Sequence, residues 1–355
     1  MIKVLVIDDS AVMRSFLGRV VEAQPDMELA AVVSDPVFAI ERIRQNAPDV
    51  ITLDVEMPRM NGLDFLRKLM AARPLPVVMI SSLTRDGADA TMRALELGAV
   101  DFFAKPASLE EFADVGDLIA EKIRAAAQAH VWPRRRTVHH ERSTGVRPAA
   151  LGRSSGLGTV IGIGASTGGV EALREILCEL PADMPPILVA QHMLPGFTAA
   201  FARRLDAICE ISVKEAEDGE DVLQGVAYVA PGGRHLLLAR RRLSYVLRVT
   251  EDAPVNRHRP SVDALFRSMA EAAASRAIGV ILTGMGADGA EGLLGLRRAG
   301  ARTVAQDEAS SVVFGMPRQA IALGGAEEVL ALGDMPARLK VLCGEQDALP
   351  AEGGA

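Results

Sequence analysis

The stretch TVIGIGASTGGVEALREIL, residues 159–177, joins a short apolar run to a helical pattern through a glycine-rich turn. This order of features predicts a strand–turn–helix unit. Two interpretations compete for the turn. Its glycines can hold a phosphate at the start of the helix, or Gly164-Ala-Ser166-Thr-Gly168 can be a nucleophile elbow of the G-x-S-x-G type. So short a motif does not decide between them, and the rest of the chain must.

The same α/β rhythm runs through the first 125 residues. Five apolar runs alternate there with amphipathic helical patterns: residues 2–7, 29–33, 49–53, 76–80 and 100–103. Five β/α repeats with short connections predict a parallel sheet covered by helices on both faces. Right-handed crossovers leave few topologies for such a sheet, and the flavodoxin-like strand order is among them.

The amino-acid composition changes after this domain. Residues 130–157 are rich in proline, serine, glycine and arginine and show no periodicity, which indicates a flexible linker over 126–156. The α/β rhythm then resumes and predicts a doubly wound parallel α/β domain over 157–345. Within it, residues of about 210–250 look like an antiparallel β-hairpin insertion. The last residues, 346–355, are expected to be a disordered tail.

Composition narrows the function classes. The chain has 355 residues and a net charge of −7, which argues against a general nucleic-acid binder. No apolar run reaches the roughly 18 residues that span a bilayer, so no membrane insertion is expected. A strand begins directly after Lys3, where a signal peptide would need its apolar core. The three cysteines lack any C-x-x-C spacing, which fits free thiols in a reducing cytoplasm.

Polar side chains follow the strands of the first domain. They are Asp8 and Asp9 after the first strand, Asp54 after the third, Ser81 and Ser82 after the fourth, and Lys105 after the fifth. Crowded carboxylates repel one another and favour a divalent cation, for which Mg²⁺ is the best match. Asp54 is then a candidate nucleophile for a phosphoryl group. Alternatively, Asp8 and Asp9 cap a helix and Asp54 opens a turn.

This half resembles the receiver domain of two-component response regulators in the motifs VLVIDDS, LDVEMPRMNG, VVMISS and FAKP. The resemblance implies phosphorylation of Asp54 by a histidine kinase. It also implies Mg²⁺ ligands: Asp9, Asp54 and the backbone carbonyl of Glu56 directly, and Asp8 through water. Ser81 and Lys105 are implied as phosphoryl contacts, and Phe102 stands where the family often has a switch aromatic residue.

The second domain bears on the choice left open at the glycine-rich turn. A dinucleotide-binding fold predicts an acidic residue at the end of the next strand. That strand ends instead in Gln191-His192-Met193, which favours the nucleophile elbow. A nucleophilic Ser166 needs a base, and only His192 stands at a carboxyl strand end. His235 lies in the hairpin as a surface or packing residue, and His258 lies in a loop where it can meet substrate.

A carboxylate that orients the base is also present. The strand GVILTG leads into Met285-Gly-Ala-Asp288-Gly, so Asp288 emerges on the same sheet edge as Ser166 and His192. The surrounding glycines let backbone N–H groups approach an oxyanion. Asp263 is the second candidate, although it is more simply a first-turn helix charge after Ser261. Taken singly, Ser166 and Asp288 can each be a helix cap and His192 a half-buried histidine.

Residues 155–345 resemble the catalytic domain of the chemotaxis protein-glutamate methylesterases. The matching motifs are GIGASTGG, AQHM, APGGRHL, HRPSVDALF, LTGMGADGA and AQDEASSVVFGMP. The resemblance implies a Ser166–His192–Asp288 triad without a cofactor and the Met285 amide at the oxyanion hole. It further implies γ-glutamyl methyl esters on the helical cytoplasmic region of chemoreceptors as substrate, and deamidation of receptor glutamine.

The expected protein is therefore a cytoplasmic, phosphorylation-activated serine hydrolase. The resemblance also suggests that the unphosphorylated receiver covers the esterase cleft. A rival hypothesis makes the second domain a non-catalytic output that binds an anion or a protein through its glycine loop. A DNA-binding output is disfavoured because the sequence has no helix-turn-helix pattern and no basic face.

Overall fold

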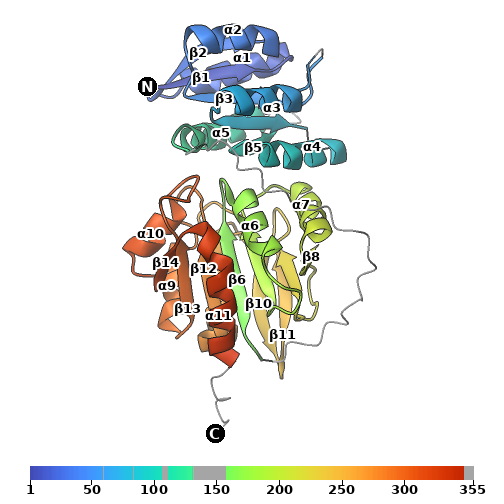
Figure 1. The fold of residues 1–355 in the computed structure, drawn as a ribbon, viewed down its shortest axis with the longest axis vertical. Coiled ribbons are helices and arrows are strands. Elements are labelled where there is room, and N and C mark those ends of the chain that lie inside the picture. Colours follow the sequence, from blue (N-terminus) through green and yellow to red (C-terminus); the bar gives the residue numbers. More distant parts are fainter. Residues whose placement is uncertain (59, 83, 106–110, 130, 132–156, 348–355) are drawn as a thin grey trace. The chain divides into compact units, whose positions relative to one another are not determined.

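The computed structural model describes residues 1–347 except for 59, 83, 106–110, 130 and 132–156. The chain divides into two compact units, Met1–Thr137 and Val138–Ala355, and each is described by itself (Figure 1). Most of the predicted linker and the predicted tail beyond residue 347 lie outside the described residues. The last helix of the first unit ends at Ala127, two residues beyond the expected domain end at 125.

Strands and helices alternate through the N-terminal unit. The elements are β1 (Ile2–Ile7), α1 (Ala11–Glu22), β2 (Met27–Val33), α2 (Pro36–Gln45), β3 (Val50–Asp54), α3 (Gly62–Ala72), β4 (Val77–Ser81), α4 (Arg85–Glu96), β5 (Asp101–Ala104) and α5 (Glu111–Ala127). Its described residues form a five-stranded parallel sheet in the order β2-β1-β3-β4-β5. This is the flavodoxin-like order, which confirms the expectation from the β/α repeats.

The apolar runs become strands because helices cover them on both faces. Every residue of β3 and β4 is buried, including the polar ones at their carboxyl ends. Side-chain caps fix where the helices begin. In each case a polar side chain accepts a hydrogen bond from the first turn: Ser10 for α1, Asp35 for α2, Asn61 for α3 and Thr84 for α4. Because the strands are parallel, their polar carboxyl ends lie at one edge of the sheet.

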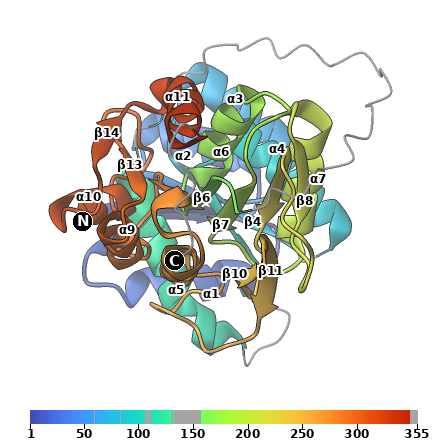
Figure 2. The same cartoon turned by 90° about the horizontal axis from the view of Figure 1, so that it is seen from below.

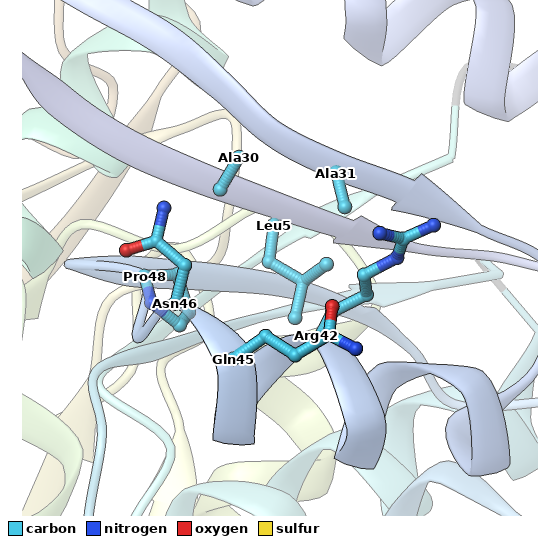
Figure 3. A pocket seen from close by; sticks show the side chains of 7 residues that line it. All are labelled: Leu5, Ala30, Ala31, Arg42, Gln45, Asn46 and Pro48. Atoms are coloured by element: carbon cyan, nitrogen blue, oxygen red, sulfur yellow. The ribbon is translucent and has the colours of Figure 1, made fainter.

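A small crevice lies between the sheet and the end of α2 (Figure 3). The pairing of β1 with β2 shifts register here, with Leu29 opposite Val4 and Ala31 opposite Leu5, so that Ala30 is the extra residue. The two alanines leave a gap that Arg42 and its α2 neighbours only partly cover. The crevice does not include the polar residues at the carboxyl ends of the strands.

The C-terminal unit contains the remaining elements. They are β6 (Val160–Ala165), α6 (Gly169–Cys178), β7 (Ile187–Gln191), α7 (Phe197–Ile208), β8 (Ser212–Glu215), β9 (Val226–Val229), β10 (His235–Arg241), β11 (Ser244–Thr250), α8 (Val262–Ala272), β12 (Ala277–Ile281), α9 (Ala290–Arg298), β13 (Arg302–Gln306), α10 (Met316–Ala322), β14 (Glu328–Leu330) and α11 (Met335–Asp347), with short 3₁₀ turns at Ala274–Arg276 and Leu332–Asp334. The described strands form a seven-stranded parallel sheet in the order β14-β13-β12-β6-β7-β9-β8, as expected for a doubly wound domain.

The insertion is smaller than the sequence predicted. Strands β10 and β11 form an antiparallel hairpin outside the main sheet, as expected. Val226–Val229, however, was assigned to the same excursion and instead pairs in parallel between β7 and β8. The reason is burial: Tyr228 is only 1% exposed, so this short apolar run occupies the interior of the sheet. The hairpin packs against α8 over a core that includes Leu236, Leu247 and Phe266.

The chain order places three strand ends together. Strand β6 lies between β7 and β12. The chain passes from β6 to β7 on one side, and only later adds β12 on the other side of β6. Helices lie on both faces, with α6 and α11 on one face and α9 on the other (Figures 1 and 2). The carboxyl ends of β12, β6 and β7 thus meet where the strand order reverses, which is where open α/β sheets bind their ligands.

Candidate active site

Ser166 is the first residue after β6 and is half-buried. Its backbone N–H donates to the Thr283 carbonyl at 3.0 Å, and its carbonyl accepts from the Gly169 N–H at 2.8 Å. The Gln191 amide also donates to that carbonyl at 2.9 Å. Gly168 closes the turn with a φ of 79°, a conformation that favours glycine. Strand, sharp turn and helix follow one another within four residues, as in a nucleophile elbow.

The loop after β12 approaches the nucleophile turn closely. A side chain at Gly284 would bring its Cβ to 2.7 Å from the Ser166 Cβ, so only glycine fits there. Met285 follows directly, and within the described part of the chain its N–H donates no hydrogen bond. A free N–H beside the nucleophile is what an oxyanion hole requires. Thr283 supports this arrangement, because its hydroxyl oxygen lies 3.0 Å from the Thr167 carbonyl, to which it can donate, and accepts the Val313 N–H at 2.9 Å.

His192 follows β7, and its Nε2 lies 2.8 Å from Asp288 Oδ2. Both side chains are shielded from solvent, at 9% and 1% exposure. The other ring nitrogen, Nδ1, is buried and has no hydrogen-bond partner among the described residues. The contact with Asp288 occupies Nε2, so Nδ1 is the ring nitrogen that can act as a base. The ring makes no hydrogen bond with Ser166 in the described structure, as is common in enzymes without substrate.

The Asp288 carboxylate sits at the N-terminus of α8. It accepts hydrogen bonds from the Ser261 hydroxyl at 2.8 Å and from the Val262 N–H at 2.7 Å. Burial alone would raise the pKa of Asp288. The hydrogen bond and charge of His192, with further hydrogen bonds from Asn256 and Ser261, outweigh burial and hold the pKa well below its usual range. Asp288 is therefore ionised and fixed in orientation at neutral pH.

Asn256 was not predicted from the sequence, yet it joins two carboxylates. Its Nδ2 donates to Asp288 Oδ1 at 2.9 Å and to Asp263 Oδ2 at 2.7 Å. It lies in a two-residue turn in which the Val255 and His258 backbones exchange hydrogen bonds. Both central residues have positive φ, 52° for Asn256 and 65° for Arg257, a pattern of type I′ turns that asparagine favours. That turn preference was the one available signal.

His258 stacks on the candidate base. Its ring centroid is 3.8 Å from that of His192, with 12° between the planes. Burial, reinforced by the neighbouring His192, lowers the pKa of His258 to about 4, so the ring is neutral at physiological pH. His235 is buried at 2% exposure, and its Nδ1 accepts the Ser261 N–H at 3.2 Å. It is thus the packing residue that the sequence allowed.

Asp263 lies in the first turn of α8, as expected, with Ser261 as the N-cap. It is not a surface charge, however, because it is only 1% exposed and accepts the Gly292 N–H at 2.6 Å. Burial raises the pKa of Asp263, and the negative charge of Asp288 adds to this rise. Among the described residues, the Asp263 carboxylate accepts from Asn256 and Gly292, whereas the hydrogen bond to His192 comes from Asp288. The geometry therefore favours Asp288 over Asp263 as the orienting acid.

The N-terminal unit gathers its own acidic cluster. Oxygen atoms of Asp8, Asp9 and Asp54 lie within 4.8 Å of one another. Lys105 Nζ lies 2.6 Å from Asp54 Oδ2 and 3.6 Å from Asp8 Oδ2. Burial, reinforced by the Asp8 charge against the opposing effect of Lys105, raises the pKa of Asp54 to about 6. Burial likewise raises the pKa of Asp8.

These residues fit a divalent cation better than a structural role. The N-cap of α1 is Ser10, so Asp9 does not supply that cap. Asp8 Oδ2 is buried and, in the described structure, has no hydrogen-bond partner and only the 3.6 Å approach of Lys105 Nζ, so a hard cation would satisfy it better. Asp54 does accept the Glu56 N–H at 3.3 Å, as the turn interpretation requires, but this uses only Oδ1.

Ser81, a predicted phosphoryl contact, and Phe102, at the switch-aromatic position, both have their side chains packed inside the unit. The Ser81 hydroxyl is buried and donates to the Gly87 carbonyl at 3.0 Å, so it must rotate to reach an anion on Asp54. Phe102 is 5% exposed and lies inside the unit, with Lys122 Nζ 5.8 Å from its ring centroid. Of the two predicted phosphoryl contacts, Lys105 already lies against the acidic cluster and Ser81 does not.

Comparison with known proteins agrees with both units. Residues 161–339 match the family model described as CheB methylesterase, and residues 4–115 match the response regulator receiver domain. The chain is therefore a response regulator whose output unit is an esterase domain. The catalytic domain of Thermotoga maritima CheB methylesterase is 43% identical in a crystal structure, with a TM-score of 0.51 over 52% of this chain and 98% of that one.

Named relatives match nearly the whole of this chain. A protein-glutamate methylesterase/protein-glutamine glutaminase of Burkholderia lata is 56% identical, with 95% of this chain and 94% of that protein covered. One from Bordetella pertussis is 54% identical over 97% and 98%. The chain belongs to the CheB methylesterase family. Membership disfavours the rival hypothesis of a non-catalytic output. Among its described helices, none is long and apolar enough to cross a membrane.

Proposed function

We propose that the protein hydrolyses glutamate methyl esters on chemoreceptors, and deamidates receptor glutamines, as an adaptation enzyme of bacterial chemotaxis. The observation that carries the proposal is the His192–Asp288 contact of 2.8 Å. It lies where the strand order of the sheet reverses, beside the strand that Ser166 follows. We infer the reaction from that geometry and from the family. The expected substrates are the cytoplasmic helices of chemoreceptors, and the expected compartment is the cytoplasm.

In the first step, Ser166 Oγ attacks the γ-carbonyl carbon of the ester. The proton of the hydroxyl passes to His192, for which Nδ1 is the available nitrogen. Asp288 holds the proton on Nε2 and stabilises the imidazolium that forms. The carbonyl oxygen becomes negative and accepts a hydrogen bond from the Met285 N–H.

Collapse of the tetrahedral intermediate completes the first half of the reaction. The imidazolium of His192 donates its proton to the departing methoxide, which leaves as methanol. The γ-glutamyl acyl group stays on Ser166 as an ester. Water then attacks that ester with His192 as base and releases glutamate. With glutamine as substrate the leaving group is ammonia, and the same residues act through the same tetrahedral geometry. None of these steps requires a cofactor in the esterase domain.

In the receiver, Mg²⁺ would be held by Asp9, Asp54 and the Glu56 carbonyl, with Asp8 through water. When bound, this ion supplies charge neutralisation for phosphoryl transfer. Asp54 is the phosphoryl acceptor, and Lys105, already 2.6 Å away, holds an oxygen of the transferred group. Ser81 joins after rotation from the Gly87 carbonyl. A chemotaxis histidine kinase is the expected phosphodonor.

Phosphorylation is expected to activate the esterase. Acetyl phosphate with Mg²⁺ should speed methanol release by the full chain but not by Asp54→Ala. A free-energy bias of about 1.4 kcal/mol toward a restrained state gives roughly tenfold activation when phosphorylation removes it. Methanol release from methylated receptor membranes measures the rate, and the segment 155–355 alone should exceed the unphosphorylated chain.

Two controls accompany this test. Asp64→Ala, at an exposed ion pair on α3, should respond to acetyl phosphate like the wild type. EDTA should remove the activation and leave the basal rate. Equal activation of the wild type and Asp54→Ala would exclude Asp54 as the phosphorylation site.

Asn256 is expected to be a positioning residue for Asp288. Asn256→Ala removes a donor from an ionised, buried carboxylate, and such a hydrogen bond contributes about 1.5–3 kcal/mol. We therefore expect kcat to fall by about tenfold or more, with KM retained. A purely structural role would instead lower the midpoint of urea unfolding and leave the kcat of the folded fraction unchanged.

A further inference from the structure

Two cysteines that the sequence separates lie against one another. Cys178 is the last residue of α6, and Cys209 directly follows the end of α7 at Ile208. Their sulfur atoms are 3.5 Å apart, and neither cysteine is part of a disulfide bond. A disulfide bond needs a sulfur–sulfur distance of about 2.05 Å, so the two sulfurs must approach by roughly 1.5 Å. Helices α6 and α7 also neighbour one another in the fold (Figures 1 and 2).

The two thiols differ in the way that reversible oxidation requires. Cys178 is partly exposed, whereas Cys209 is 1% exposed. The hydrogen bond with Cys209 lowers the pKa of Cys178, helped by the charge of Arg174 and opposed by burial. An accessible thiol with a lowered pKa beside a second thiol is the arrangement of redox-responsive cysteines. Cys343, in α11, is buried and serves as the internal comparison.

We propose that Cys178 and Cys209 form a reversible disulfide that fastens α6 to α7. A peroxide oxidises the Cys178 thiol to a sulfenic acid and is itself reduced, releasing water when the oxidant is hydrogen peroxide. The Cys209 sulfur then attacks the Cys178 sulfur, and a second water leaves with the sulfenic oxygen and the Cys209 proton. A dithiol reductant reverses the bond by exchange.

The disulfide would join two helices that support the catalytic residues, but neither cysteine takes part in the proposed reaction. Helix α6 begins at Gly169, next to the Ser166 turn, and α7 follows the loop that carries His192. The cysteines join the opposite ends of these two supporting helices. Closing the chain between residues 178 and 209 restricts the unfolded state. We expect the disulfide to raise the unfolding midpoint by about 5–10 °C. This inference does not depend on the proposed catalytic triad.

The test uses the full chain treated with hydrogen peroxide and then freed of it. Titration with a thiol reagent under denaturing conditions should show a fall from three free cysteines to one. Peptide mapping should recover the peptides of Cys178 and Cys209 as one disulfide-linked species. Dithiothreitol should restore all three thiols and reverse the rise in unfolding midpoint.

Matched serine variants assign the bond. Cys343→Ser should still lose two thiols and gain thermal stability, whereas Cys178→Ser and Cys209→Ser should do neither. In Cys209→Ser, the sulfenic acid on Cys178 should persist and react with dimedone. A mapped disulfide with other partners, no loss of thiols, or an unchanged unfolding midpoint after oxidation would each overturn the proposal.

Discussion

Ser166→Ala will abolish methanol release from methylated receptors while the protein stays folded. The hydroxyl is half-buried at the end of β6, and its removal leaves the backbone contacts with Thr283 and Gly169 intact. Loss of a triad nucleophile lowers kcat on the order of 10⁶-fold in serine hydrolases. The measurement is methanol release per folded enzyme, with folding checked by the urea midpoint.

A serine elsewhere in the same unit provides the matched control. Ser212 is exposed at the start of β8, remote from the three strand ends. Ser212→Ala should retain full activity and labelling by a phosphonate reagent, while Ser166→Ala loses both. Near-normal turnover by a folded Ser166→Ala protein would refute the nucleophile assignment, whatever the behaviour of the cysteine pair.

Asp288→Asn should lower kcat by about 10⁴-fold, the size of the corresponding effect in serine proteases. The amide keeps the shape of the site but no longer stabilises the proton on His192 Nε2 or the imidazolium. Some stability is lost too, because the amide presents a donor where the Val262 N–H and Ser261 hydroxyl need acceptors. Kinetics with methylated receptor, normalised to folded protein, separates the two effects.

Asp263→Asn is the matched comparison, since both carboxylates share the Asn256 amide. Its Oδ1 accepts the Gly292 N–H, so the substitution should lower the free energy of unfolding by about 1–3 kcal/mol. The kcat of the folded protein should change little in comparison with Asp288→Asn. The opposite ranking of the two kcat values would make Asp263 the orienting acid.

The strand pattern carried most of the fold prediction. Continuous apolar runs such as residues 76–80 need cover on both faces, and this dictates a parallel sheet. The carboxyl ends of its strands then lie at one edge, so the sequence alone was enough to predict that Ser166, His192 and Asp288 share that edge. Local propensity did not separate Val226–Val229 from the hairpin, because a four-residue apolar run suits either sheet.

Contacts between distant loops were beyond the sequence. Asn256 and Asp288 are 32 residues apart in the sequence. Their hydrogen bond depends on the direction in which the turn around Asn256 points, and hydrophobic periodicity does not predict that direction. The burial of Asp263 was missed for the same reason: a carboxylate in a first helical turn is usually solvated, and here Gly292 and Asn256, neither of which the sequence predicted as a contact, pack against it. The approach of Cys178 to Cys209 likewise follows from how α6 and α7 pack.

The placement of Asp288 at the start of α8 couples fraying of this helix to orientation of the catalytic base. The same carboxylate accepts the first N–H of α8 and orients the His192 imidazole, so any fluctuation that frays the first turn of α8 also releases the base. Amide hydrogen exchange at Val262 should therefore report how often the enzyme is transiently incompetent. Changes in length between β11 and α8 would displace that turn and, with it, the hydrogen bonds that orient Asp288.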